Sequence, residues 1–400
     1  MKICQSEQRM KIESFDAIII GGGLIGSLMG CLLASKGLNV AIIEKQDPAQ
    51  TLKNTFDGRT TSISYGSSLI FKEAGVWPLL EPQAYPILTI KVADLKGRGF
   101  LTYAASDVGN HPMGYMVENR HLRQTLYEQC QALAPLTYFA PMSVQDVSRE
   151  PFKVRVVLEN QVILEAPLLI SAEGRQSPLR DKAGIGCRTW NYEQACLVFV
   201  AAHEKPHLGT AYEYFQTHGP LATLPLTDYN SAIVWTDKKS VAESFHTLPE
   251  EDFNKEMNRR FGDALGVLSL KGQRWVYPLS GLLAKTLSSH RLALVGDAGH
   301  AIHPVAGQGM NLGIRDCKAL SDLLQEAKDL GGDLGSQTLL QTYARRRKID
   351  NASMAAMTHG LIQLFSNDHQ SLSYIRSKGL MIVDRLSFLK RKLARHAMGL

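Results

Sequence analysis

The chain has 400 residues, 44% of them apolar and 20% charged, which is typical of a globular protein with room for two or three domains. The formal net charge of +6 is small for this length and does not indicate nucleic-acid binding. The 6 cysteines include no Cys-x-x-Cys pair, so we expect buried free thiols in a reducing compartment and no metal site. The N-terminal segment lacks the apolar core of a secretory signal, and no stretch is apolar enough for a membrane span, so we expect a cytoplasmic protein.

The first predicted unit is a strand, a glycine-rich loop, a helix and a second strand. Residues 15–20 form a short apolar run typical of a buried strand, and residues 25–36 are expected to be helical. "LNVAIIE", residues 38–44, is a second buried strand. The intervening Gly-x-Gly-x-x-Gly therefore lies where a dinucleotide-binding fingerprint must lie.

Each position of this motif has a physical role. Gly21 permits a tight turn, Gly23 lets the backbone approach a pyrophosphate, and Gly26 lets the helix pack closely on the strand. The helix N-terminus offers free N–H groups to the phosphates. Glu44 ends the second strand, where a carboxylate accepts hydrogen bonds from ribose hydroxyls and repels a 2′-phosphate. The unit predicts FAD or NAD rather than NADP at this site, and an ordinary tight turn is the alternative.

The middle of the chain changes character. Residues 187–276 alternate apolar and polar side chains between turn signals, which predicts an antiparallel sheet, and part of 87–101 is expected to join it. This sheet is expected to form a substrate pocket. Candidate lining residues are aromatic or proline, and core packing explains each equally well: Tyr212, Tyr214, Trp235 and Pro278.

A second ligand signal lies at residues 291–316. The strand "LALV" is followed by Gly296 and Asp297, then by a loop and a helix expected from Met310 through Leu324. A ligand in an open α/β sheet lies at the carboxyl ends of the strands, so both glycine loops should share one ligand. The loop residues expected to lie beside it are Pro304, Gly307 and Gly309.

The chemistry of this second loop fits a flavin. Asp297 can accept hydrogen bonds from ribityl hydroxyls, and Gly307 and Gly309 permit backbone contact with a flat ring. The helix that begins near Met310 would stabilise the negative charge of a reduced flavin. A strand, turn and helix with a polar cap is the alternative.

Several motifs resemble one known family. "GDAGHAIHPVAGQGMNLGIRD" closely resembles the second FAD motif of the class A flavoprotein monooxygenases, the aromatic hydroxylases, and "DGRTTSIS" and "LISAEGRQSPLR" fall in that family's order. "DGRTTSISYGSSLIFKEAGVW", "GYMVENRHLRQTL" and the C-terminal "GLMIVDRLSFLKRKLARHAMGL" are similar to the ubiquinone-biosynthesis hydroxylases. The resemblance extends from about residue 14 to the end of the chain.

The resemblance implies an α/β fold. A Rossmann-like FAD-binding domain of the glutathione-reductase/p-hydroxybenzoate-hydroxylase type is expected over 14–80, 110–185 and 280–330. An inserted mixed or antiparallel β-sheet domain for the substrate is expected over 81–109 and 186–279, and C-terminal helices over 331–400.

The resemblance also implies roles for single residues. Arg59 would lie near the flavin and the route of the nicotinamide cofactor, Asn119 would contact FAD, and Gln124 would reach the phosphates. Glu173 stands where the family usually has Asp, an acid serving FAD and NAD(P)H together, and a structural role for it is equally open. Met310 and Asn311 complete the flavin motif. Arg120, with its neighbour Arg123, could neutralise pyrophosphate charge or be a solvated helix residue.

The function expected is hydroxylation of the aromatic ring of a prenylated phenol in ubiquinone biosynthesis. FAD would be reduced by NAD(P)H and would form a C4a-hydroperoxide with O₂. Only one complete nucleotide cradle is found, so the nicotinamide cofactor is expected to bind transiently. The sequence does not identify a side chain that would act as the base to deprotonate a phenol. The alternatives are an oxidase, reductase or epoxidase on the same scaffold, and a non-catalytic assembly component that binds flavin or a quinone precursor.

The composition of the C-terminal stretch indicates which surfaces or partners it could contact. Residues 376–400 carry a strong excess of Lys and Arg with apolar residues at helical spacing, which suits an anionic membrane, a partner protein or a solvated face packed on the body. The expected partners are a lipid-tailed aromatic substrate and O₂, with no nucleic acid. Peripheral contact with the inner face of the membrane, a complex with other ubiquinone-biosynthesis proteins and a homo-oligomer remain open.

Overall fold

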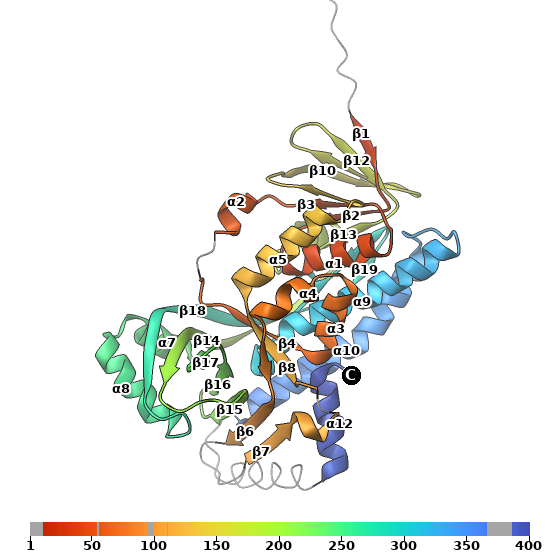
Figure 1. Cartoon of the computed structure of the whole chain (residues 1–400). Helices are drawn as coiled ribbons and strands as arrows, with labels where there is room; N and C mark the ends of the chain where they lie inside the picture. The colour runs from red at the N-terminus through yellow and green to blue at the C-terminus, as the bar shows by residue number, and fades with distance from the viewer. Residues whose placement is uncertain (1–10, 54–55, 95–99, 110, 366–385) are drawn as a thin grey trace, which may run out of the picture.

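A central, mostly parallel sheet carries the first glycine loop (Figure 1). The structure is a computed structural model that describes residues 11–53, 56–94, 100–109, 111–365 and 386–400, so residues 376–385 of the basic stretch lie outside the described ranges. The strand order is β19 (Ser288–Ser289), β20 (Leu292–Leu294), β13 (Leu169–Ser171), β2 (Ala17–Ile20), β3 (Val40–Ile43) and β9 (Leu136–Phe139). Only β19 is antiparallel to its neighbour in this order.

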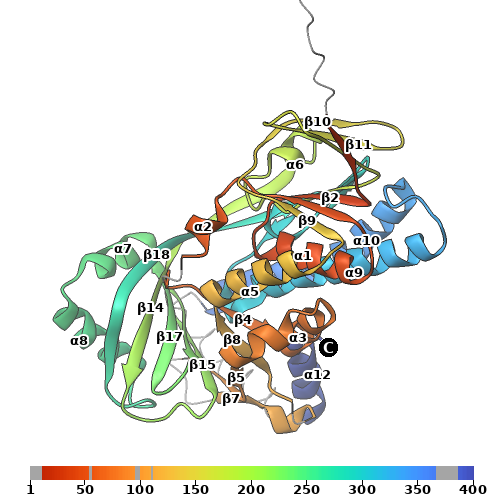
Figure 2. The same ribbon diagram turned by 45° about the horizontal axis from the view of Figure 1, so that its top comes forward.

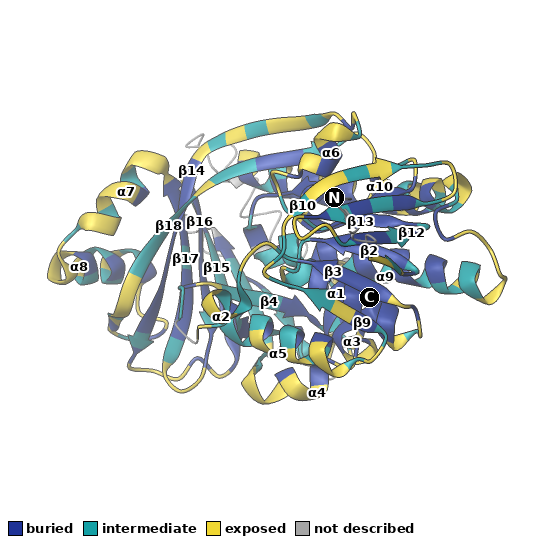
Figure 3. Cartoon of the chain, turned by 90° about the horizontal axis from the view of Figure 1, so that it is seen from above, coloured by how far each residue is buried: buried dark blue, intermediate teal, exposed yellow. Residues whose placement is uncertain are grey.

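Burial of apolar side chains stabilises the central sheet. Every residue of β2 and β3 is buried, as the dark blue strands of Figure 3 show. The helices α1 (Leu24–Ser35), α5 (Asn119–Ala132) and α9 (Gln308–Asp329) pack with this sheet, and α1 contacts both of the others. Burying one Ile or Leu side chain stabilises a fold by about 1.5–3 kcal/mol, which is why these continuous apolar runs become central strands.

A large, mainly antiparallel sheet forms the second half of the molecule. Its order is β21 (His300–Ala301), β18 (Leu268–Ala284), β14 (Cys187–His203), β17 (Asn230–Lys238), β16 (Gly219–Pro225), β15 (Thr210–Gln216), β6 (Thr89–Asp94) and β7 (Phe100–Ala104). The expected antiparallel character and the participation of residues from 87–101 are confirmed, with β15 and β6 as a parallel pair. The helices α7 (Lys239–Thr247) and α8 (Glu250–Phe261) were not expected from the sequence.

The two faces of the large sheet have different neighbours (Figure 2). On the outer face, Phe199 and Trp235 pack in an apolar cluster with Phe253 of α8. The inner face turns toward the central-sheet half of the molecule, where the Trp275 ring lies against Gly58 and the Tyr277 hydroxyl donates to the Asp57 carbonyl over 3.3 Å. Side chains alternate between these faces along every strand.

Two smaller sheets complete the architecture. One has the order β4 (Thr60–Ser64), β8 (Gly114–Glu118) and β5 (Tyr85–Ile87), and the other has the order β1 (Ile12–Ser14), β12 (Ile163–Ala166), β11 (Val154–Leu158) and β10 (Val144–Arg149). The short helices are α2 (Pro48–Thr51), α3 (Tyr65–Glu73), α4 (Trp77–Leu80) and α6 (Pro178–Lys182).

Two helices end the described chain. α10 (Gln337–Phe365) packs against α9, and α12 (Ser387–Met398) lies beside α3. Ala394 and Met398 of α12 are buried among apolar residues that include Met116, so one face of this basic helix packs on the protein body. In the described ranges we find no helix with the length and apolarity that crossing a bilayer demands.

Candidate functional site

The first glycine loop has the geometry of a dinucleotide cradle. Gly21 has φ +103°, which a side chain would strain. A Cβ on Gly26 would lie 1.8 Å from the Gly21 carbonyl oxygen, so only glycine lets α1 approach this loop. A Cβ on Gly23 would meet nothing within 4 Å, which leaves this backbone open to a ligand. These three environments fit the three roles expected of the motif.

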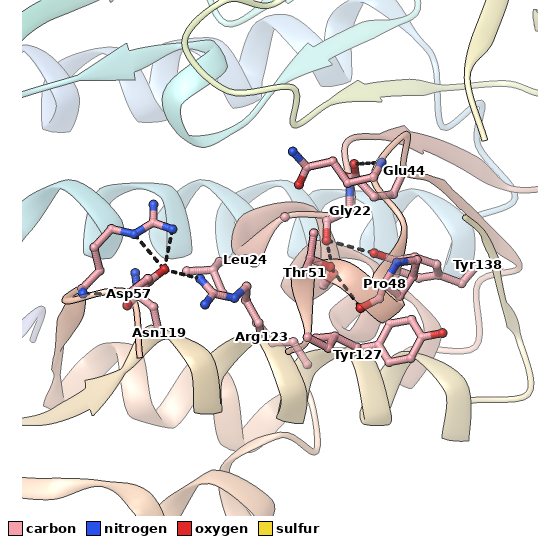
Figure 4. Close-up of a pocket in the computed structure, with 16 residues that line it drawn as sticks. Gly22, Leu24, Glu44, Pro48, Thr51, Asp57, Asn119, Arg123, Tyr127 and Tyr138 are labelled. Atoms are coloured by element: carbon pink, nitrogen blue, oxygen red, sulfur yellow. Dashed lines mark hydrogen bonds and ion pairs between the residues drawn. The ribbon is translucent and has the colours of Figure 1, made fainter. Parts of the chain in front are cut away.

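A cavity of about 400 Å³ opens beside this loop (Figure 4). Its walls come from the glycine loop, the end of β3, α2, the loop before β4 and the first turns of α5. The Tyr138 hydroxyl on β9 donates to the Gly22 carbonyl over 3.0 Å and closes one wall, which no sequence signal indicated. The lining residues are Gly22, Gly23, Leu24, Ser27, Glu44, Gln46, Pro48, Thr51, Leu52, Asp57, Arg59, Asn119, Arg123, Leu126, Tyr127 and Tyr138.

Glu44 stands at the end of β3 with its carboxylate in this cavity. One oxygen accepts a hydrogen bond from the Gly22 N–H over 2.7 Å, and the other accepts from the Gln46 N–H over 2.8 Å. A carboxylate has about four acceptor sites, so capacity remains for hydroxyl donors such as those of a ribose.

The loop before β4 brings a charged cluster to the opposite end of the cavity. The Asp57 carboxylate accepts from the Arg59 guanidinium over 2.7 Å and from Arg123 of α5 over 3.1 Å. Burial raises the pKa of Asp57, but the two arginines outweigh it and hold that pKa below its usual value. Since one carboxylate faces two guanidinium groups, the cluster carries net positive charge toward the cavity.

The start of α5 contributes some of the expected residues and not others. Asn119 lines the cavity and accepts a hydrogen bond from Thr61 over 2.6 Å, and Arg123 also lines it. Gln124 is exposed and pairs with Glu128, so the structure does not place it at this cavity wall. Its position lies about 100° around the helix from Arg123, which lines the cavity.

Arg120 also differs from the expectation. Its guanidinium donates to Glu118 over 2.5 Å and lies 5.9 Å from the centre of the Phe56 ring. It is absent from the cavity lining, so Arg123 is the arginine of α5 that reaches this space.

The second glycine loop places Asp297 in a concave position. Gly296 has φ +61°, and the short 3₁₀ turn that follows leaves Asp297 accessible while Gly296 and Ala298 are buried. Burial raises the pKa of Asp297, whereas the nearby charges of His300 and then Arg175 lower it by less. A side chain that solvent reaches while protein surrounds it is available to a bound ligand.

Gly307 begins α9 in the left-handed conformation, with φ +63°. A Cβ on Gly309 would meet nothing within 4 Å, so this backbone is open, whereas a Cβ on Gly307 would approach Ser62 to 3.0 Å. The buried Asn311 side chain accepts from the Ser64 N–H and donates to the Ser62 carbonyl, each over 2.9 Å. Asn311 therefore fixes the loop to β4, and a contact of this position with a ligand would come from its backbone.

The two other loop residues flank this helix start. Pro304 is partly buried and precedes the turn that ends at the first residues of α9, and Met310 is partly buried against the main core. His303, next to Pro304, is buried with its ring 4.9 Å from that of Tyr192.

The helices α1 and α9 have open N-termini, as do α5, α7 and α12. Neither α1 nor α9 has a side-chain cap or an acidic residue in its first turn. By contrast, α2, α3 and α6 are capped by Asp47, Ser64 and Ser177. Uncapped N-termini leave N–H donors and a partial positive charge available to an anion.

The same two helix starts converge in space. Ile25, in the first turn of α1, would be 2.8 Å from a Cβ on Gly313 of α9 and 3.1 Å from one on Gly296. The two glycine loops therefore border one continuous site. Its donors, hydroxyl acceptors and open backbone fit FAD: Gly22 and Gly23 could hold the pyrophosphate, Glu44 the ribose and Asp297 the ribityl chain.

Glu173 is engaged in local structure. Its carboxylate accepts from the Ser177 hydroxyl over 2.6 Å, from the Ser171 hydroxyl over 3.0 Å and from the Leu179 N–H over 3.2 Å. These contacts hold the start of α6, so the structure supports the structural alternative left open for this residue.

The three aromatic residues that the sequence suggested as lining of a substrate pocket lie on the outer face of the large sheet. Tyr212 and Tyr214 of β15 and Trp235 of β17 point to the outer face, where they join the cluster with α8. Trp235 is 1% exposed, and Pro278 is exposed on the long strand β18. The role of these three aromatic residues in a substrate pocket stays a prediction, and alternation along a strand does not reveal which face the helices cover.

The fold and this site define a flavoprotein with a Rossmann-type FAD cradle. Residues 14–357 match the FAD binding domain family. A ubiquinone hydroxylase of Rhodospirillum rubrum is 41% identical over 384 residues, covering 96% of this chain and 89% of the relative. The 3-demethoxyubiquinol 3-hydroxylase of Escherichia coli is 32% identical and covers 98% of this chain and 100% of the relative. The chain therefore belongs to the family of FAD-binding hydroxylases to which these enzymes belong, and FAD is its cofactor.

Solved structures agree on the fold. The p-nitrophenol 4-monooxygenase of Pseudomonas putida matches with a TM-score of 0.79 at 14% identity, over 97% of this chain and 99% of that one. The expected Rossmann-like α/β class is confirmed by this likeness.

Proposed function

We propose that this protein is an FAD-dependent monooxygenase that hydroxylates the aromatic ring of a prenylated phenol in ubiquinone biosynthesis. NAD(P)H would serve as a transient reductant and O₂ as the source of oxygen. The observation that supports this most is the full-length likeness to two hydroxylases, at 41% and 32% identity, in a chain that keeps the complete cradle.

FAD supplies the redox and oxygen-transfer chemistry when it is bound. The chain's own residues bind and orient it: Gly22 and Gly23 offer backbone donors, and Asp297 and Glu44 offer acceptors. The start of α9 at Gly307 directs uncapped N–H groups toward the loop that precedes it, where they would stabilise negative charge on a reduced ring.

The test measures first the flavin absorbance of the purified protein and finally the product of the reaction. The purified protein should carry a flavin spectrum, and NAD(P)H oxidation should rise on adding a prenylated phenol. The product should gain one oxygen atom by mass spectrometry, and its NMR spectrum should identify the ring carbon. NAD(P)H oxidation that yields only peroxide with every phenol supplied would refute the proposal and support an oxidase.

We also propose that α12 brings the protein into peripheral contact with an anionic membrane, which would give access to a lipid-tailed substrate. Phe388 is 77% exposed, and the basic residues Lys392 and Arg395 are exposed on the same helix. An apolar ring beside exposed cations suits an interfacial helix. Cosedimentation with phosphatidylglycerol vesicles should weaken several-fold in a Lys392→Glu/Arg395→Glu variant, and unchanged cosedimentation would refute the contact.

A further inference from the structure

Glu213 is a carboxylate on the inner face of the large sheet, and the residues that the structure describes provide it with no partner. It lies on β15 between Tyr212 and Tyr214, which point to the outer face. Within the described ranges no donor or cation contacts its carboxylate, and burial is the sole cause that shifts its pKa. A buried carboxylate without a partner is costly, so its presence calls for a ligand that it serves.

The strand register fixes the direction in which Glu213 points. It pairs with Ala222 of β16, which pairs with Val234 of β17, and that residue pairs with Val198 of β14. Val198 in turn pairs with Trp275, whose ring lies against Gly58. Directly paired residues project from the same face of a sheet, so Glu213 shares the inner face with Trp275.

The same face leads to the flavin loop. Phe215, two residues further along β15, packs against Val305, which directly follows Pro304. Two residues of a strand span about 6.6 Å. Glu213 is therefore the next residue on this face of β15 beside Phe215, which packs with the flavin loop.

The surroundings of Glu213 are apolar and made of small side chains. Its neighbours in the register are Val92, Ala222, Val234 and Val198. Glu213 is partly exposed, so a ligand on the inner face could reach it. Burial raises the pKa of Glu213 to about 7.

Few other ionisable groups share this face. Burial raises the pKa of Cys196 on β14 to about 12, and Glu213 adds to that shift. Tyr277 of β18 lies on the inner face, and Tyr192 of β14 packs in the same cluster as Phe215 and Val305. His303 stands on the flavin loop, where burial lowers its pKa to about 4, so it is neutral near pH 7.

We propose that Glu213 is the general base that accepts the phenolic proton of the substrate. The O–H bond breaks, its electron pair stays on the phenol oxygen, and the proton forms a bond to a carboxylate oxygen of Glu213. The neutral acid then donates a hydrogen bond to the phenolate, and the ring carbons ortho and para to that oxygen become more nucleophilic. This inference rests on the proposed function, since it requires a phenol as the substrate.

The chemistry requires a base, and among the groups named above Cys196 has a raised pKa and His303 a lowered one, which leaves Glu213 as the group with a pKa near 7. An ideal general base has a pKa near the working pH, and general-base catalysis typically contributes about 10²–10⁴-fold to a rate. The small apolar neighbours would admit a ring and leave Glu213 as the polar group that orients its hydroxyl.

The experiment compares three variants as flavin-loaded proteins. Glu213→Gln should lower the rate of hydroxylation of a prenylated phenol by about 10²–10⁴-fold. The ascending limb of its pH–rate profile, with a midpoint near 7 in the wild type, should disappear. Glu213→Asp should keep part of the rate. Glu159→Gln, which removes an exposed carboxylate on the turn between β11 and β12, should match the wild type.

A second substrate separates a base from a structural residue. A ring-fluorinated prenylated phenol ionises at lower pH without help, so it should restore much of the rate in Glu213→Gln. A Glu213→Gln variant with the wild-type pH profile, or an equal loss with both phenols, would overturn the proposal. If the wild type hydroxylates neither phenol, the proposed function fails instead, and the two failures are thus distinguishable.

Discussion

Asp316 lies at the centre of a buried network that holds the flavin loop. Its side chain is 0% exposed and accepts from His300 over 2.6 Å, from Arg347 of α10 over 2.7 Å and from the Gly296 N–H over 3.0 Å. We predict that Asp316→Asn destabilises the protein by about 3–5 kcal/mol, because it removes the fully buried charge that Arg347 and His300 share and leaves the partly exposed Asp350 as the carboxylate beside Arg347. This is a large share of the roughly 5–15 kcal/mol that stabilises a typical protein.

The assay is urea unfolding of the flavin-free protein, with Asp322→Asn as the control. Asp322 pairs with Lys36 and Lys318 but is 35% exposed, so its loss should cost under about 1 kcal/mol. Burial raises the pKa of Asp316, but His300 and then Arg347 outweigh it and hold that pKa below its usual value. The stabilisation is therefore present above the ordinary carboxyl pKa of about 3.9 and disappears as the pH falls below it. Equal losses for the two variants at pH 7 would refute this reasoning.

Three further predictions concern the cofactor and the inner face. Asp297→Ala should purify with less than stoichiometric FAD by absorbance, and full occupancy would refute its assigned role. Gly26→Ala should unfold at lower urea because its Cβ would collide with Gly21, whereas Gly23→Ala should keep its stability within about 0.5 kcal/mol and bind FAD more weakly in a fluorescence titration. Glu213 has a raised pKa, so it costs stability as the pH rises from about 4.5 to about 7. Glu213→Gln should therefore be more stable than the wild type at pH 8, by up to about 3 kcal/mol, and a lower unfolding midpoint there would contradict this.

The cradle could be predicted from the sequence because its chemistry is local. Gly21, Gly23 and Gly26 act through their own backbone, and Glu44 follows its strand directly. The turn at Gly307 is local in the same way. Each of these roles depends on a few neighbouring residues, so short stretches of sequence were sufficient to identify them.

The substrate side could not be predicted because it depends on which face of a sheet is covered. The pattern Tyr-Glu-Tyr at Tyr212, Glu213 and Tyr214 shows that one residue opposes the other two, but not which side meets the flavin loop. The helices α7 and α8, which settle that question, come later in the chain and were not expected. The prediction named Tyr212 and Tyr214 because of their size, whereas Glu213 between them points to the inner face.

The cofactor cradle and the inner face of the large sheet can vary independently of each other. In the proposed site, backbone groups and two carboxylates would hold FAD, so its binding should tolerate change in most side chains around the cavity. The space for the proposed substrate would be set instead by small residues of the inner face, Ala222, Val198 and Val234, which lie in register with Glu213. Enlarging one of them would restrict the ring that can bind without touching the cradle. Substrate preference and cofactor affinity are therefore separable in this fold, since different elements and different kinds of contact determine them.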